Sequence, residues 1–283
     1  MKDKKWIYLM LIVLCIAVFF GYRSFDRVRT DSRAPEISVD TQQLQVSVHD
    51  PEELLLQGVT ARDNRDADVT DSLVVENVRL LQADGTAVVT YAAFDRSGNV
   101  AKAQREILYT DYESPRFTLD RSLTFAHGTG FDIMDVVGAR DLLDGNISHR
   151  VRATAMDDVA ISNQGIHDVL FRVTNTLGQT VELTLPVEVY ASGLYDARVT
   201  LTDYLVYLDA DAAFHPNQYL DSFAIGSEKT DLARGIPEEL TVRITGEVDT
   251  GAPGVYPVAY KISMIRGTNV FTGYAKLIVV VEG

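Results

Sequence analysis

The chain has 283 residues, a formal net charge of −14 and one cysteine, Cys15; residues 30–283 alone hold 20 basic and 38 acidic side chains, a charge of −18. A surface this acidic excludes nucleic acid as a partner, because phosphate binding needs basic patches. Because Cys15 lies in the apolar N-terminal run, the rest of the chain contains no disulfide, thiol nucleophile or cysteine-based metal site.

The N-terminal segment predicts a membrane anchor. Residues 6–22 are 17 uncharged residues, and as a helix they would span roughly 25 Å of bilayer. Trp6 and Tyr22 lie where interfacial aromatics are common. A cleaved signal peptide is the alternative, but no small-x-small site follows the run and Leu14 precedes Cys15. We therefore expect a cytoplasmic tail over 1–5, an uncleaved transmembrane signal anchor over 6–22 and a juxtamembrane stalk over 23–33.

The next segment predicts a small β domain. Apolar or alternating runs are separated by turn signals such as Asp50-Pro51 and Ser97-Gly98-Asn99. The strands expected from these runs cover residues 44–48, 54–61, 73–80, 87–94 and 100–109. Short strands at this spacing are typical of a sandwich or a barrel.

A repeat of about 80 residues indicates that this domain occurs more than once. The acidic segment 61–70 returns as 139–148, and the turn 95–99 returns as 175–179. A strand-like run from a glycine to an aromatic residue precedes each turn. This run occurs three times, at residues 85–91, 165–171 and 254–260.

The repeat predicts three modules, over residues 34–110, 114–190 and 194–283, of which the third is the most divergent. Proline follows the stalk and the first linker in the same way, as Pro35 and Pro115. Outside the anchor, only residues 209–214 favour a helix.

The repeated residues resemble the bacterial immunoglobulin-like repeats of surface proteins, which include Ig-like modules of pesticidal crystal proteins and hyaline-repeat modules. The first module matches at Val59, Ala61, Asp63, Asp66, Asp68, Val69, Thr70, Gly85, Tyr91, Asp95, Gly98 and Asn99. The second matches at Ala139, Asp141, Asp144, Gly145, Ile147, Gly165, Phe171, Asn175 and Gly178, and the third keeps Gly254, Tyr256 and Tyr260. The resemblance implies an all-β chain of three tandem Ig-like β-sandwiches behind one N-terminal transmembrane helix. Modules of this family serve as spacers and as binders.

The acidic box of the first module is the candidate metal site. Four carboxylates, those of Asp63, Asp66, Asp68 and Asp71, lie within nine residues and could supply oxygens to Ca²⁺. The spacing lacks the Gly and Glu of an EF-hand, and aspartates also cap turns through their side chains, which explains the box without a metal. Both interpretations stay open, and no other cofactor is expected.

Turn chemistry accounts for most of the other repeated polar residues. The predicted structural turn positions are Asp95, Gly98, Asn99, Asp141, Asp144 and Gly178. Residues 95–98 fit a type I turn, with Asp accepting backbone N–H bonds and Gly at the fourth position. The aromatic residues Tyr91, Phe171 and Tyr260 are expected to point into the sandwich, with the tyrosine hydroxyls bonded to backbone.

The third module contains the candidate binding face. Tyr204, Tyr207 and Tyr219 lie among amides and acids, a composition typical of sugar- or protein-binding surfaces, although an ordinary core with edge aromatics is the alternative. No nucleophile elbow, P-loop or dinucleotide motif is present, so we do not expect an enzyme.

These features together predict a bacterial single-pass plasma-membrane protein with a cytoplasmic N-terminus and extracellular C-terminal modules. The flanks of the anchor carry equal numbers of Lys and Arg, so the orientation depends on the five-residue tail being too short for a domain. The expected function is adhesion or interaction at the cell surface through a glycan or protein partner. A non-binding structural spacer or a subunit of a cell-envelope complex is the alternative.

Overall fold

The computed structural model describes residues 2–29, 31–40, 43–80, 82, 84–155 and 162–283; in the N-terminal helix it describes the side chains of residues 6 and 10–22. The chain begins with that helix, α1 (Lys2–Arg29), which contains the predicted anchor. Over the part of the chain that the structure describes, no helix combines the length and the apolar character needed to cross a membrane. The anchor over residues 6–22 stays a prediction from the sequence.

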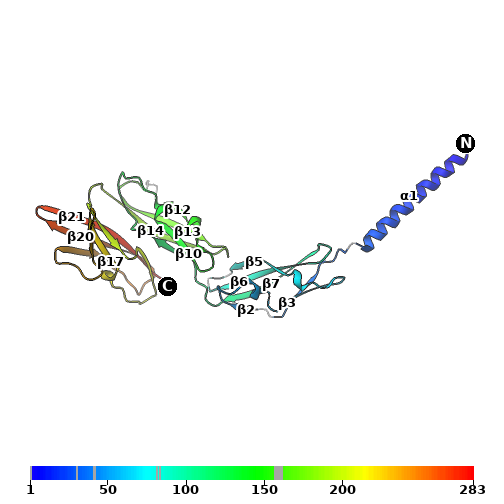
Figure 1. Cartoon of the computed structure of the whole chain (residues 1–283), viewed down its shortest axis with the longest axis horizontal. Helices are drawn as coiled ribbons and strands as arrows, with labels where there is room; N and C mark the ends of the chain where they lie inside the picture. The colour runs from blue at the N-terminus through cyan, green and yellow to red at the C-terminus, as the bar shows by residue number, and fades with distance from the viewer. Residues whose placement is uncertain (1, 30, 41–42, 81, 83, 156–161) are drawn as a thin grey trace. The chain divides into compact units, whose positions relative to one another are not determined.

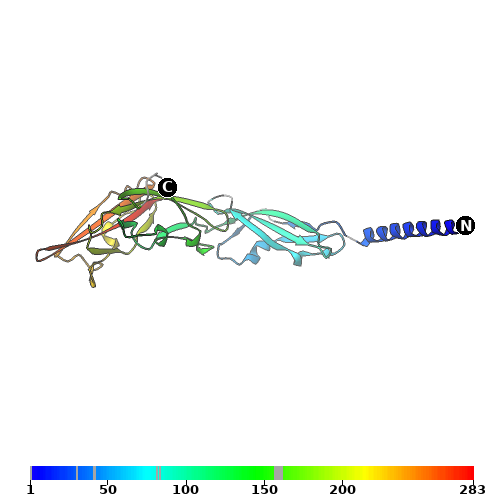
Figure 2. The ribbon, with the colours of Figure 1, turned by 90° about the horizontal axis from the view of Figure 1, so that it is seen from above.

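The first copy of the repeat folds into two sheets. One sheet has the order β1–β3–β4, with β1 (Glu36–Val39), β3 (Val59–Asp63) and β4 (Ala67–Asp68). The other has the order β2–β7–β6–β5, with β2 (Gln43–Val46), β7 (Val100–Tyr109), β6 (Thr86–Phe94) and β5 (Val74–Leu80). Figures 1 and 2 show β5, β6 and β7 side by side. All pairs are antiparallel except β2 with β7, which is parallel.

Alternation along β6 explains why these strands bury one face. Ala87, Val89 and Tyr91 are fully buried, whereas the residues between them are partly exposed, as expected when side chains point to opposite faces in turn. The Tyr91 hydroxyl donates a 2.7 Å hydrogen bond to the backbone oxygen of Leu55. The inward orientation predicted for Tyr91 is therefore confirmed, and the same holds for the fully buried Phe171 and Tyr260.

The predicted strand over residues 54–61 is wrong in its first half. Glu52–Leu56 forms a 3-10 helix, η1, and the strand begins only at Val59. Pro51 precedes η1 with a φ of −66°, and Gly58, at a φ of +72°, ends the turn before β3. Leu55 is buried while Leu54 is exposed. The apolar residues of this run therefore form a helical turn instead of the predicted strand.

The second copy repeats the same pairing. Its sheets have the orders β8–β10–β11 and β9–β14–β13–β12. Their strands are β8 (Arg116–Leu119), β10 (Val137–Asp141), β11 (Gly145–Asn146), β9 (Thr124–Ala126), β14 (Thr180–Tyr190), β13 (Gly165–Thr174) and β12 (Arg152–Ala155). The β9 strand is parallel to β14, just as β2 is parallel to β7. Short 3-10 helices lie at Thr70–Ser72 in the first copy and at Ile133–Asp135 and Ser148–Arg150 in the second.

The third copy keeps these pairs but joins them into one sheet, in the order β18–β17–β15–β21–β20–β19, with β16 also paired to β21. The strands are β15 (Ala197–Leu201), β16 (Leu205–Leu208), β17 (Leu220–Ile225), β18 (Glu228–Asp231), β19 (Leu240–Thr245), β20 (Gly254–Arg266) and β21 (Asn269–Val281). The pair that joins the two sheets, β15 with β21, has no counterpart in the sheet orders of the first two copies. The helix expected over residues 209–214 is absent, and the only helical turn of this copy among the described residues is the 3-10 helix at Pro216–Tyr219.

The strands belong to two compact units, Met1–Tyr112 and Glu113–Gly283. The second unit has one hydrophobic cluster around Phe117 and Phe171 and another around Phe223 and Tyr260. Ile278 of β21 is part of the first of these clusters, so the second and third copies share buried residues. The all-β, sandwich-like fold is therefore confirmed, whereas the division into modules at 34–110, 114–190 and 194–283 stays a prediction.

Candidate functional site

The acidic box begins where β3 ends, and its backbone folds around Asp63. Oδ2 of Asp63 accepts the backbone N–H groups of Arg65, at 2.6 Å, and of Asp66, at 2.9 Å. The bond from Asp66 has the largest effect, and with the bond from Arg65 it holds the pKa of Asp63 below its usual value. Asp63 is thus an ionised turn residue, although only 8% of it is exposed.

Two carboxylates from outside the box approach Asp63. Asp31 precedes β1, and Asp95 follows β6, and one carboxylate oxygen from each of the three residues lies within 4.8 Å of the others. Asp31 is 6% exposed and Asp95 is 8% exposed. We call these three residues the carboxylate cluster. Among the described residues it is the one group of acids, histidines or cysteines arranged closely enough to hold a metal ion.

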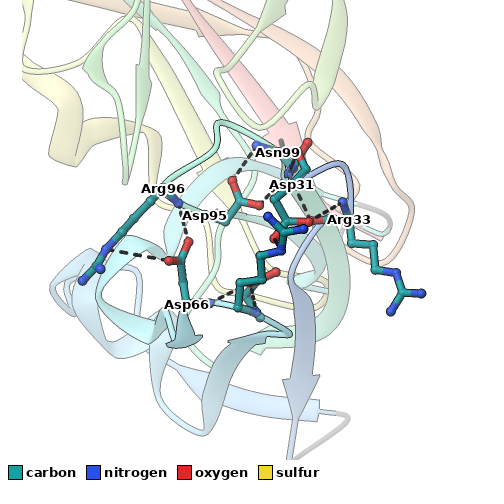
Figure 3. A network of polar contacts seen from close by, with 8 residues as sticks. Asp31, Arg33, Asp66, Asp95, Arg96 and Asn99 are labelled. Carbon is teal, nitrogen blue, oxygen red and sulfur yellow. Dashed lines mark hydrogen bonds and ion pairs between the residues drawn. The ribbon is translucent and has the colours of Figure 1, made fainter. Parts of the chain in front are cut away.

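Asn99 organises one side of the cluster (Figure 3). Its amide nitrogen donates to Oδ2 of Asp95 at 2.6 Å and to the backbone oxygens of Asp31 and Arg33 at 3.2 and 3.1 Å. Its backbone N–H donates to Oδ1 of Asp95 at 2.7 Å. The turn after β6 is thereby fastened to the segment that precedes β1.

The other side of the cluster has polar atoms without hydrogen bonds. Oδ2 of Asp31 and Oδ1 of Asp63 are buried and accept no hydrogen bond, although Oδ1 of Asp31 accepts the backbone N–H of Arg33 at 3.1 Å. The nearest described cation is Arg65, whose Nε lies 3.5 Å from Oδ2 of Asp31 and whose side chain is 44% exposed. Two of the three carboxylates therefore keep a buried oxygen that accepts no hydrogen bond, and that of Asp31 has a cation beside it.

The four acids predicted as metal ligands do not come together. Asp66 accepts the backbone N–H of Arg96 at 2.8 Å and points toward that residue in Figure 3, and Asp68 accepts the N–H of Thr70 at 3.0 Å. Asp71 is exposed. Of the predicted set only Asp63 reaches the carboxylate cluster, because a box on one hairpin spreads its side chains over several directions.

The residues predicted as structural turn positions lie in hydrogen-bonded turns. Gly98 and Gly178 have φ values of +85° and +84°, and each donates its N–H to the backbone oxygen of the residue three positions earlier. Asp141 accepts the N–H groups of Leu143 and Asp144 at 3.0 and 2.9 Å. The structural role assigned to Asp95, Asn99, Asp141 and Asp144 stays a prediction, and Asp95 also belongs to the carboxylate cluster.

A groove of about 300 Å³ lies between strands of the second and third copies, inside the second unit. Four tyrosines line it: Tyr190, Tyr195, Tyr204 and Tyr274. Tyr195 packs edge-to-face on Tyr190 at 4.9 Å and stacks on Tyr274 at 5.0 Å. Arg121 and Arg198 line it as well. We call this feature the tyrosine–arginine groove.

Some polar groups at this groove are paired with other residues, and others have no described ion-pair partner. The hydroxyl of Tyr274 donates to Glu188 at 2.9 Å, and burial raises the pKa of this tyrosine well above its usual value. Glu188 also pairs with the buried Lys276. Arg121 lies over the ring of Phe125, with 5.8 Å between its guanidinium carbon and the ring centroid. Neither Arg121 nor Arg198 forms an ion pair with a carboxylate among the residues described.

The structure contradicts the predicted binding face of Tyr204, Tyr207 and Tyr219, because the three side chains do not share one surface. Tyr219 is 8% exposed and stacks on Phe214 inside the core of the third copy. The Tyr207 hydroxyl accepts the N–H of Phe117 at 3.0 Å, and burial raises its pKa to about 12. Only Tyr204 lines the tyrosine–arginine groove. Sequence reasoning missed Tyr190 and Tyr274 because they belong to strands of different copies.

No protein-family model and no curated protein matches the sequence. Among solved structures, the CBM51-2 and INT-domain structure of Clostridium perfringens ZmpB with GlcNAc is 15% identical, with a TM-score of 0.22, and the match covers 88% of this chain and 42% of that one. Drosophila N-cadherin EC1-4 is 13% identical, with a TM-score of 0.22, over 90% and 76% of the two chains. Mouse cadherin-23 EC22-24 is 12% identical, with a TM-score of 0.21, over 89% and 99%. The chain spans less than half the length of the first of these, and likenesses this weak carry no argument about what it binds.

Proposed function

We propose that the chain is a bacterial cell-surface interaction protein whose second unit binds a glycan with acidic groups in the tyrosine–arginine groove. Residues 6–22 hold it in the plasma membrane, with the N-terminus cytoplasmic and the β-sandwich modules extracellular. The observation that carries the proposal is the presence of two arginines without carboxylate partners in a groove lined by tyrosines. No catalytic step is part of this function.

The chemistry of the groove favours an anionic, ring-shaped ligand. A guanidinium offers a planar fork of donors that matches a carboxylate or sulfate group. Tyrosine rings offer apolar faces and polar tips, the combination common in small-molecule sites. The chain as a whole carries a charge of −14. Two arginines without carboxylate partners in one groove therefore form a locally positive site on an acidic protein. A binding role gives these arginines a counterion that the protein itself does not supply.

The test is binding of the purified full chain, in detergent micelles, to polygalacturonate and to its carboxyl-reduced, neutral form. We expect saturable binding to the acidic polymer alone, and we expect Arg121→Gln and Arg198→Gln each to weaken it roughly tenfold, the size of one lost charge-assisted contact. Arg234→Gln is the matched control, because it removes the same charge from an exposed arginine of the same unit that pairs with Asp231. Equal binding of both polymers, or equal effects of all three variants, contradicts the proposal.

The alternative is a structural spacer or a subunit of a cell-envelope complex. It is favoured by the contacts that join the second and third copies, such as the pair of Arg116 with Glu282 at 2.8 Å and the bond from the Lys276 N–H to Ser122 at 2.9 Å. Such contacts suit a stiff unit that holds other parts at a distance. Failure of the wild-type chain to bind any acidic or neutral glycan supports this alternative.

A further inference from the structure

We propose that Asp31, Asp63 and Asp95 bind one divalent cation, and that this cation is Ca²⁺. The site lies in the first unit and is independent of the tyrosine–arginine groove. It also differs from the acidic box of the sequence, since two of its three residues lie outside that box.

The unsatisfied oxygens are the first argument. A buried polar atom without a hydrogen bond is costly, and nearly all such atoms in native proteins have a partner. Oδ2 of Asp31 and Oδ1 of Asp63 have no hydrogen bond, and both residues are more than nine-tenths buried. A bound cation would satisfy both oxygens at once, because carboxylate oxygens are the ligands that Ca²⁺ prefers.

Distance is the second argument, because one cation must reach all three residues. Ca²⁺ binds oxygens at about 2.3–2.6 Å, so two of its ligands can lie up to about 5 Å apart. One oxygen from each of the three residues lies within 4.8 Å of the other two, so a single ion can reach all three. Mg²⁺ requires oxygens at about 2.0–2.1 Å in near-ideal octahedral geometry. Ca²⁺ accepts about six to eight oxygens in irregular arrangements, so three carboxylates from separate segments, with solvent supplying further ligands, suit Ca²⁺ better.

Charge is the third argument. Three ionised carboxylates bring three negative charges into a buried volume, where like charges repel strongly. Arg65 is 3.5 Å from Asp31 and supplies one positive charge from a partly exposed position. Two negative charges remain, and a divalent cation balances them.

The second copy of the repeat acts as an internal comparison. Asn175 occupies the position of Asp95, and its amide nitrogen donates to Oδ2 of Asp141 at 3.0 Å. Asp111, four residues before Pro115 as Asp31 is before Pro35, instead accepts the Ser47 hydroxyl at 2.6 Å and the Val48 N–H at 2.8 Å. The same fold therefore forms without a carboxylate cluster, so folding alone does not explain the three acids of the first copy.

The consequence of binding is local stiffening. The cation would connect the segment before β1, the hairpin after β3 and the turn after β6, which Asn99 already links in part. A ligand that binds only the folded state stabilises it in proportion to the logarithm of its concentration. Ca²⁺ would thus fix the point at which the chain enters the first sandwich.

The experiment is isothermal titration of Ca²⁺ into chelator-treated full chain in detergent micelles, together with thermal unfolding with and without Ca²⁺. We expect one Ca²⁺ per chain and a higher Tm for the first unit. Asp31→Asn and Asp95→Asn should each weaken Ca²⁺ binding roughly tenfold or more, because affinity follows the number of charged ligands. Asp71→Asn, which removes an exposed acid of the box outside the cluster, should leave the affinity and the Tm shift unchanged.

Folding of the variants is checked by circular dichroism, and Asp95→Asn is expected to fold because Asn175 occupies the same position in the second copy. The proposal is overturned if the wild-type chain takes up no Ca²⁺, or if Asp71→Asn loses binding as Asp31→Asn does. Stronger binding of Mg²⁺ than of Ca²⁺ would overturn the choice of ion. Groove variants such as Arg198→Gln should bind Ca²⁺ normally, so the two proposals fail separately.

Discussion

A single difference between aspartate and asparagine separates the chemistry of two repeated turns. Asp95 and Asn175 both accept a backbone N–H through Oδ1, from Asn99 and Gln179. Their second side-chain atoms differ, because Oδ2 of Asp95 can only accept, whereas the Asn175 amide donates to Asp141. The first copy therefore brings the carboxylates of Asp63 and Asp95 close together at the turn. In the second copy the Asn175 amide instead donates a hydrogen bond to the carboxylate of Asp141.

We expect Asn175→Asp to destabilise the second unit by about 1–3 kcal/mol, the cost of losing a buried partner and leaving an acceptor unsatisfied. The variant removes the 3.0 Å bond to Asp141 and places two carboxylates together. The measurement is the urea midpoint of the transition of residues 113–283. The reverse variant, Asp95→Asn, removes like-charge repulsion but also the acceptor of the Asn99 amide. In metal-free buffer it should therefore destabilise the first unit by less than Asn175→Asp destabilises the second. An unchanged midpoint for Asn175→Asp would show that the amide contributes no net stability.

The position of Asp31 shows what sequence patterns leave out. The box concentrates acids within a few residues, and that local density favoured Asp66, Asp68 and Asp71 as ligands. The folded site instead joins residues more than thirty positions apart, through the pairing of β1 with β3 and the turn after β6. The sequence does single out Asp31, because Asp31 and Asp111 each lie four residues before a proline, Pro35 and Pro115. This repeated spacing does not reveal which residues Asp31 contacts in the folded chain.

At the scale of elements, strands with clear alternation and turn signals were predictable. The expected runs 73–80, 87–94 and 100–109 correspond to β5, β6 and β7 within one residue at either end. The 3-10 helix η1 was not predictable, because its three leucines suit a strand equally well. The parallel pair of β15 with β21 was also missed, since it depends on Gly273, where a Cβ would lie 2.9 Å from Cγ2 of Val199.

Two glycines that flank β6 should differ in their tolerance of alanine. Gly98 has a φ of +85° with open space around its Cα, whereas a Cβ on Gly85, at a φ of +94°, would lie 2.3 Å from the backbone oxygen of Tyr109. We expect Gly98→Ala to cost about 1–2 kcal/mol from backbone strain. Gly85→Ala should cost more, because β7 must also move. Urea unfolding of the first unit measures both costs, and equal midpoints would contradict the importance of the steric contact.

At the scale of the whole chain, the compact units do not follow the repeat. The second and third copies share polar contacts as well as apolar ones: the Tyr207 hydroxyl accepts the N–H of Phe117, and Glu188 of β14 pairs with Lys276 of β21. Lys276 is 6% exposed, and Glu188 also accepts the Tyr274 hydroxyl. A buried pair of this kind costs little when complete and much when one partner is removed.

We therefore expect Glu188→Gln to destabilise both copies of the second unit together. The variant leaves the Lys276 ammonium buried without a counterion, and the expected loss is about 3 kcal/mol. Glu182→Gln is the matched control on the same strand, because Glu182 pairs with Arg172 at the surface, where both side chains are largely exposed, and it should cost less than about 1 kcal/mol. Hydrogen exchange read along β14 and β21 measures the effect. Faster exchange in both strands, with the first unit unchanged, is the signature of one cooperative unit; faster exchange in β14 alone would mean that the two copies unfold independently.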